Sequence, residues 1–187
     1  MTTKVKLTDV RLSFPVLFKA EEFKAGDGKP RFSAAFLIQP GSENDKAINA
    51  AIAAEANTTF EKKASVMLES FRGNANKYCY MKGDLKDYDG YAGMMVLASH
   101  RRASSGRPLV IDQQKNPLVE EDGKPYGGCY VNATVEIYGQ KGENAGIRCG
   151  LLAIQFARDG DAFTAGTKPS ADDFDDIKEG ATAEDLV

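Results

Sequence analysis

Polar and apolar residues alternate along the first forty positions of the chain, which is the pattern of β-strands that bury one face. Residues 5–14 alternate with one slip near Asp9, and such a slip is typical of a β-bulge. We expect Pro15 to end this strand. After a turn at residues 26–30, alternation resumes over residues 31–39 and predicts a second strand.

A long amphipathic helix follows these two strands. Ser42 begins a sequence that resembles a capping box, with Asp45 in place of the more usual Glu or Gln. Apolar residues then recur every three or four positions as far as Phe71. A polar interruption at residues 57–59 leaves open whether this region is one helix or two.

Short alternating stretches separated by turn residues return after Gly73. The expected strands cover residues 77–82, 91–100, 108–112, 128–138 and 147–157. The fourth of these alternates most cleanly and is predicted to point Cys129, Val131, Ala133, Val135 and Ile137 inward. Five to seven strands with one inserted helix favour a mainly β fold, a small closed or nearly closed barrel. An immunoglobulin-like sandwich is the alternative, and the long helix fits it poorly.

Charge is distributed unevenly along the chain. The net charge is −3, but residues 171–187 carry seven acidic side chains and one lysine, a local charge of −6 that leaves +3 on residues 1–170. We expect a folded domain over residues 1–166 and a disordered acidic tail over residues 167–187, which has too few bulky apolar residues to offset the entropy lost on ordering.

Two interpretations of the tail remain open. It is either a solubility device or a segment that competes for a basic groove and docks partner proteins. The tail residues singled out for the second role are Asp172, Asp173, Phe174, Asp175, Asp176, Glu184, Asp185, Leu186 and Val187.

The composition narrows the cellular setting. No stretch approaches the roughly 20 consecutive apolar residues of a membrane span, and the N-terminal residues lack the apolar core of a signal peptide. Three cysteines without paired spacing indicate free thiols in a reducing compartment. We therefore expect a cytoplasmic protein with no membrane partner.

Candidate catalytic groups are scarce. His100, the one histidine, is followed by Arg101 and Arg102, whose positive charges disfavour its use as a base near neutral pH. Three cysteines and a histidine are a possible zinc set, but Cys79, Cys129 and Cys149 lack the close pairing of structural zinc sites, so core packing is favoured. We expect no enzyme activity, no metal and no cofactor.

Aromatic and basic residues instead share loops and strand ends, a mixture that suits single-stranded nucleic acid, because bases stack on rings while Arg and Lys contact phosphates. Phe14, Phe32 and Phe36 alternate with apolar residues and are assigned to the core, whereas Tyr130 and Tyr138 point away from it. The predicted binding residues are Phe18, Lys19, Lys29, Arg31, Lys77, Tyr80, Lys82, Tyr88, Tyr91, Arg101, Arg102, Arg107 and Tyr130.

Three segments carry a resemblance to a known family. Residues 10–18 (VRLSFPVLF), 86–93 (KDYDGYAG) and 121–133 (EDGKPYGGCYVNA), in this order and spacing, resemble the tailed-phage single-stranded DNA-binding proteins with an OB fold. The resemblance spans about residues 4–160, and the acidic C-terminal tail is similar to tails of this class. It implies a five-stranded Greek-key barrel with extra strands, sequence-tolerant coating of single-stranded DNA, and a role in phage replication, recombination or repair inside the bacterial host.

The sequence therefore predicts a non-enzymatic protein that coats single-stranded DNA, with a tail that modulates DNA access or recruits replication or recombination proteins. The alternative is a virion or assembly component in which the barrel is an interaction module without nucleic-acid binding. A nuclease is a more distant third. The sequence leaves homo-oligomer formation open.

Overall fold

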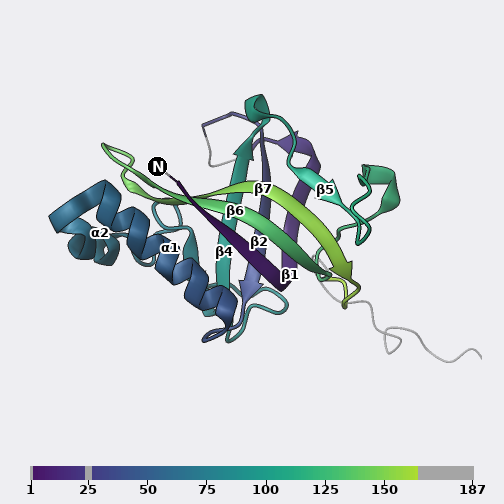
Figure 1. The fold of residues 1–187 in the computed structure, drawn as a ribbon, viewed down its shortest axis with the longest axis horizontal. Helices are drawn as coiled ribbons and strands as arrows, with labels where there is room; N and C mark the ends of the chain where they lie inside the picture. The colour runs from purple at the N-terminus through teal and green to yellow at the C-terminus, as the bar shows by residue number, and fades with distance from the viewer. Residues whose placement is uncertain (1, 24–26, 164–187) are drawn as a thin grey trace, which may run out of the picture.

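A computed structural model describes residues 2–23 and 27–163 of the chain. The strands are β1 (Thr2–Glu21), β2 (Arg31–Ile38), β3 (Tyr80–Lys82), β4 (Met95–Arg102), β5 (Leu109–Ile111), β6 (Tyr130–Gln140) and β7 (Gly146–Arg158). They form one sheet in the order β3-β4-β2-β1-β6-β7-β5 (Figure 1). The tail residues from Asp172 to Val187, and the expected boundary at residue 166, lie outside the described residues.

Five of these strands close into a barrel. β1 pairs with β2 on one side and with β6 on the other, and β4 and β7 complete the circle by pairing with each other. The closing pair is parallel and consists of a single residue pair, His100 with Gly150. The short strands β3 and β5 add to the edges of β4 and β7. The prediction of a small closed β-barrel with extra strands is confirmed.

The first strand bends twice. Asp9 adopts a positive φ of 51°, and the pairing with β6 shifts register between Leu7 and Val10, which confirms the predicted bulge. The prediction that Pro15 ends the strand is wrong, because β1 continues to Glu21. Its register with β6 extends only to Arg11, so no partner strand on that side needs a backbone N–H from Pro15.

Phe14 corrects a second prediction. The residue adopts a positive φ of 45° at an irregularity in the pairing with β2, and its side chain is 54% exposed rather than part of the core. The other two phenylalanines assigned to the core are buried, Phe32 at 7% and Phe36 at 0% exposed. Simple alternation fails at Phe14 because an irregular residue changes which face of the strand the next side chain occupies.

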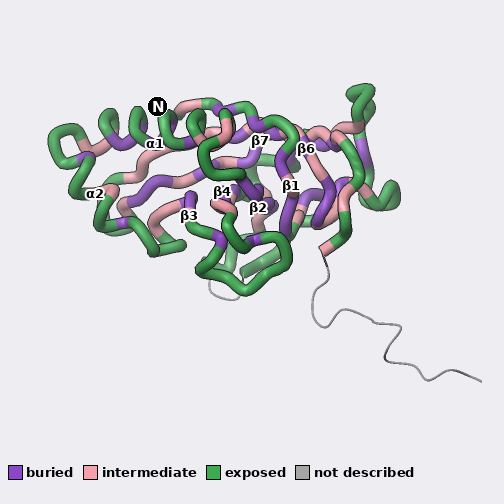
Figure 2. The backbone as a smooth tube through the Cα atoms, turned by 90° about the horizontal axis from the view of Figure 1, so that it is seen from below, coloured by how far each residue is buried: buried purple, intermediate pink, exposed green. Residues whose placement is uncertain are grey.

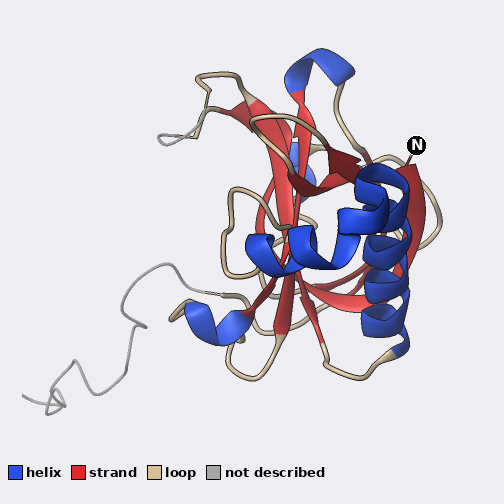
Figure 3. Cartoon of the chain, turned by 90° about the vertical axis from the view of Figure 1, so that its left-hand side faces the viewer, coloured by secondary structure: helices blue, strands red, loops and turns tan. Residues whose placement is uncertain are grey.

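Two helices cover one end of the barrel, as Figure 3 shows. They are α1 (Glu43–Phe60) and α2 (Ala64–Phe71), with a single 3₁₀ turn between them. The backbone N–H of Asp45 donates to the Ser42 side chain, as in the predicted cap, and Asp45 in turn accepts from the backbone of Gly41. The break comes at Glu61, where φ is +51°, slightly after the predicted interruption.

The barrel interior and the inner face of α1 form one hydrophobic core. Ile48, Ile52 and Ala56 of the helix are at most 3% exposed, whereas its outer turns face solvent (Figure 2). Cys129 is buried as predicted, together with Cys79 and Cys149, and all three are free thiols. No helix among the described residues is long and apolar enough to span a membrane.

Replacing Phe36 with alanine should lower the free energy of unfolding by about 3–5 kcal/mol, because the fully buried ring leaves a cavity. Phe14→Ala is the matched control, since it removes the same ring from an exposed position and should cost less than about 1 kcal/mol. Urea denaturation followed by circular dichroism measures both. Equal losses for the two variants would contradict the core described above.

Candidate nucleic-acid interface

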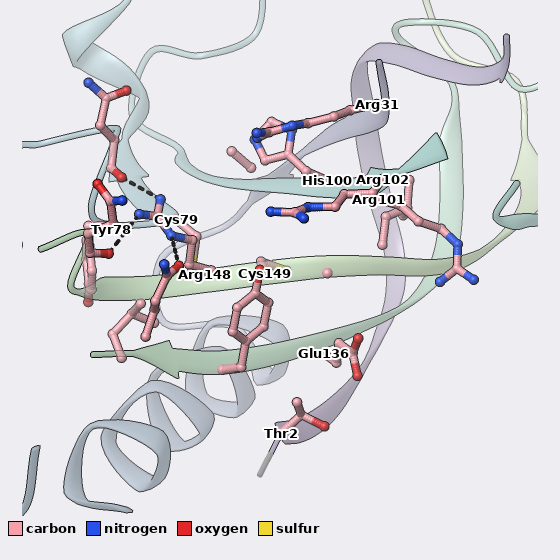
Figure 4. A pocket seen from close by; sticks show the side chains of 18 of the residues that line it. Thr2, Arg31, Tyr78, Cys79, His100, Arg101, Arg102, Glu136, Arg148 and Cys149 are labelled. Atoms are coloured by element: carbon pink, nitrogen blue, oxygen red, sulfur yellow. Dashed lines mark hydrogen bonds between the residues drawn. The ribbon is translucent and has the colours of Figure 1, made fainter. Parts of the chain in front are cut away.

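A groove opens on the barrel wall where β4 and β7 diverge from their single point of pairing. It encloses about 670 Å³ and lies between the β1–β2 connection and the β6–β7 hairpin, which supply Asp27 and Asn144 to its lining. Side chains from β2, β4, β6 and β7 point into it (Figure 4). The groove therefore results from the way the barrel closes. Residues distant in sequence meet there because their strands end or separate at the same place.

One wall of the groove is basic. Arg31 begins β2 and pairs in register with Arg102 at the end of β4, while the adjacent pair joins Phe32 to Arg101. This register brings together three arginines that the sequence analysis singled out, and all three line the groove. The structure therefore places Arg31 beside the 101–102 pair although seventy residues separate them in sequence.

Two of these arginines, Arg31 and Arg101, are held in different ways. Arg31 forms an ion pair of 2.9 Å with Asp27. A hydrogen bond from the backbone N–H of Lys29, and then the Arg31 guanidinium, lowers the pKa of the Asp27 carboxyl. Arg101 donates through Nε to the carbonyl of Gly106 (2.8 Å) and through Nη2 to that of Ser105 (2.7 Å), which fixes its position without neutralising its charge.

Arg148 of β7 is a fourth groove arginine, which the sequence analysis missed. Its Nε donates to Oε1 of Gln140 (3.1 Å), one Nη to the carbonyl of Asn144 (3.2 Å), and the other to the carbonyl of Asn76. All three acceptors are uncharged, so the cation remains uncompensated while it ties the β6–β7 hairpin to the turn after α2. The signal in the sequence is an arginine between the buried residues Ile147 and Cys149, at the start of a strand whose next residues, 149–154, are all apolar.

His100 lies among these cations. Its ring contacts Phe23 edge-on, with centroids 5.8 Å apart. Removal of solvent around the imidazole, followed by the positive charges of Arg31 and Arg148, lowers its pKa below the ordinary value of 6.5. The groove of the free protein therefore holds a neutral imidazole at pH 7.

Two half-buried tyrosines supply aromatic surface to the groove. Tyr138 on β6 points away from the core, as predicted, and lines the groove, as does Tyr78 before β3. Burial raises the pKa of both phenols, so both hydroxyls are protonated at neutral pH. The sequence analysis predicted Lys77 as a binding residue and missed Tyr78, which follows it directly.

Two tyrosines predicted to bind DNA are buried and offer no ring face on which a base could stack. Tyr80 is 3% exposed and donates a 2.6 Å hydrogen bond to Oδ1 of Asp45 at the start of α1. Tyr91 is 4% exposed, and its hydroxyl shares a 2.9 Å hydrogen bond with that of Ser13. These phenols serve the packing of helix and loop against the barrel, and we leave them out of the proposed interface. Alternation alone could not reveal this, because the partner groups come from other elements.

The other predicted residues lie outside the groove lining. Arg107 places its guanidinium over the Phe18 ring at 5.5 Å, and Lys19 pairs with Glu120 at 3.4 Å. Tyr130 lies against Arg158, at 3.6 Å from guanidinium to ring centroid, and lines a second hollow of about 440 Å³. The remaining predicted residues that the groove lining does not include are Lys29, Lys77, Lys82 and Tyr88.

The chain is similar to phage proteins in sequence and in fold. The chain is 43% identical over 177 residues to "Putative protein p50" of Acyrthosiphon pisum secondary endosymbiont phage 1, covering 93% of this chain and 94% of that protein. The structure is also similar to that of the single-stranded DNA-binding protein of bacteriophage Enc34 in complex with ssDNA, with a TM-score of 0.70 at 22% identity over 86% of this chain and 89% of that one.

A more distant likeness is to gp2.5, a single-stranded DNA-binding protein encoded by bacteriophage T7. The TM-score is 0.51 at 12% identity, over 97% of this chain and 98% of that one. These structural likenesses confirm the OB fold that the sequence resemblance implied. Residues 3–187 match the family described as "Enterobacter phage Enc34, ssDNA-binding protein", and the chain belongs to that family.

Proposed function

We propose that this protein binds single-stranded DNA in the groove between β4 and β7, and that its affinity depends little on the DNA sequence. The observation that carries the proposal is the meeting of four arginines and two tyrosines in one concavity: Arg31, Arg101, Arg102, Arg148, Tyr78 and Tyr138. Guanidiniums contact phosphates of any sequence, and every base has a face that stacks on a ring. Single strands expose those faces, whereas a duplex hides them.

The family supports this proposal. The family is named for a phage ssDNA-binding protein. The structure of that Enc34 protein has been solved in complex with ssDNA, and its fold is similar to the present one. We propose that the present protein likewise coats and protects single-stranded DNA during phage replication, recombination or repair in the host cytoplasm. Its function in this proposal is binding rather than chemistry. Removal of solvent around His100, followed by the positive charges of Arg31 and Arg148, lowers the pKa of this titratable ring in the groove and makes it a weaker base.

A second part of the proposal concerns the tail. The segment before it is anchored to the barrel: the backbone N–H of Phe163 donates to the carbonyl of Gly127 (2.9 Å), and the Arg11 guanidinium lies 4.2 Å from the Phe163 ring centroid. The tail that follows carries a charge of −6. We propose that it competes with DNA for the basic groove and recruits replication or recombination proteins.

Arg102→Ala should weaken binding to oligothymidine about five- to tenfold at low salt, because one phosphate contact is lost. The slope of log affinity against log salt should also become shallower by roughly 0.7, the value for one contact to a single strand. Fluorescence anisotropy across a salt series measures both quantities. Lys46→Ala, which removes an exposed cation of α1 that does not line the groove, is the charge-matched control and should leave affinity nearly unchanged. Absence of binding by the parent protein would overturn the proposal and favour the assembly module.

Deleting residues 171–187 should tighten binding to oligothymidine at low salt, because the competing negative charge is removed. The difference should shrink as salt is raised. A variant that replaces the same residues with a neutral Gly/Ser segment of equal length separates charge from length, and it should behave like the deletion. If both variants bind as the parent does, competition by the tail is excluded.

Affinity should rise as pH falls from 7.5 to 5.5, by up to about tenfold per pH unit, the limit for uptake of one proton. The sign follows from His100. Its pKa is lowered in the free groove, and a bound phosphate opposes that shift, so the bound state has the higher pKa and takes up the proton. The gain is lost as pH rises through the bound-state pKa. In His100→Asn the dependence should flatten, and an unchanged pH profile in this variant would assign the effect to another group.

A further inference from the structure

We infer that Glu136 reads the edge of one base in the bound strand and gives the groove a preference for guanine and cytosine over thymine. This inference rests on the proposed function, because it assigns a base-selective role to one residue of the same groove. It concerns the one lining residue whose charge opposes phosphate binding and is not engaged elsewhere.

Glu136 lines the groove. It occupies β6 opposite Gly150 of β7, the residue at which β7 pairs with His100 of β4 to close the barrel. A Cβ atom on Gly150 would lie 2.8 Å from Cγ and 3.0 Å from Oε1 of Glu136, so the Glu136 side chain crosses over β7 in the space that glycine leaves open. The carboxylate therefore reaches from β6 to the closing pair of the barrel.

The carboxylate of Glu136 is unpaired. Within residues 2–23 and 27–163 it forms no hydrogen bond or ion pair, although Lys4 lies opposite it in the β1–β6 register. The other carboxylate of the groove, that of Asp27, is paired with Arg31. A free carboxylate in a cleft built from arginines repels phosphates, so its position favours the part of the ligand that can donate hydrogen bonds to it.

The groove is lined by arginines from β2, β4 and β7 and by the carboxylate of Glu136 on β6. In Figure 4 Arg31 lies on one side of the groove and Glu136 on the other. Tyr138 follows two residues after Glu136 on β6, so both side chains lie on one face of the strand, about 7 Å apart. A base stacked on Tyr138 therefore presents its edge to Glu136, while its phosphate lies toward the arginines.

The chemistry of base edges then sets the preference. A carboxylate only accepts hydrogen bonds. Guanine offers two adjacent donors, at N1 and N2, and cytosine offers its exocyclic amino group. Thymine has one imino donor between two carbonyl oxygens, which the carboxylate repels. One position of the bound strand is thus selective within an otherwise tolerant groove.

The test compares Glu136→Gln with the parent protein on three oligonucleotides of equal length: oligothymidine, oligocytidine and an alternating guanine–thymine sequence. The glutamine side chain has the same shape, and it donates as well as accepts, so it no longer disfavours thymine. We expect the preference for the cytosine and guanine oligonucleotides over oligothymidine to fall by about fivefold or more. Fluorescence anisotropy at fixed salt and pH 8 measures the three affinities.

The matched control is Glu143→Gln, which makes the same charge change on the β6–β7 hairpin but does not line the groove. It should shift all three affinities by one common small factor. If Glu136→Gln also shifts all three by a common factor, or changes none, then Glu136 does not read bases and the inference is wrong while DNA binding stands. Failure of the parent protein to bind any of the three would overturn the proposed function itself. Thermal melts of both variants confirm that each remains folded.

Discussion

The parallel contact between His100 of β4 and Gly150 of β7 is the constraint on which the rest of the structure depends. It closes five strands into a barrel, which buries the core without leaving β4 and β7 as long open edges. Because the contact is a single residue pair, the two strands diverge at once, and the wall beyond them is open. Closure and groove are thus two consequences of one contact, and the glycine at that point leaves room for a side chain from β6.

The net charge of this protein does not reveal its basic groove, whereas the local charge of the groove lining does. The total of −3 conceals a groove with four arginines, two of which are held by uncharged acceptors alone. Hydrogen bonds to carbonyl oxygens fix a guanidinium without removing its charge, so an incoming phosphate meets a cation that is already in place. Arg31 is the exception among the described groove arginines, because it forms an ion pair with Asp27, and an incoming phosphate can replace the Asp27 carboxylate.

The sequence predicted the barrel, the bulge at Asp9, the N-cap at Ser42 and the inward face of β6, because each depends on local periodicity or on one capping side chain. It misplaced Phe14, where the backbone irregularity changes the face of the strand, and it could not foresee that Tyr80 and Tyr91 find hydrogen-bond partners on distant elements. It found Arg31, Arg101 and Arg102 by residue type but missed Arg148 and Glu136, because neither lies in an aromatic and basic stretch. Their importance arises from register between strands, which no local pattern encodes.

Arg148 has a consequence for how changes at this position should be interpreted. Its planar head bridges three acceptors that approach from different directions, on the strand, on the hairpin and on the turn after α2. A lysine keeps the positive charge, but its ammonium sits on a flexible stem and cannot span the same three oxygens. Replacing Arg148 with lysine, a change usually regarded as conservative, would therefore preserve the charge of the groove but release the β6–β7 hairpin from the turn after α2.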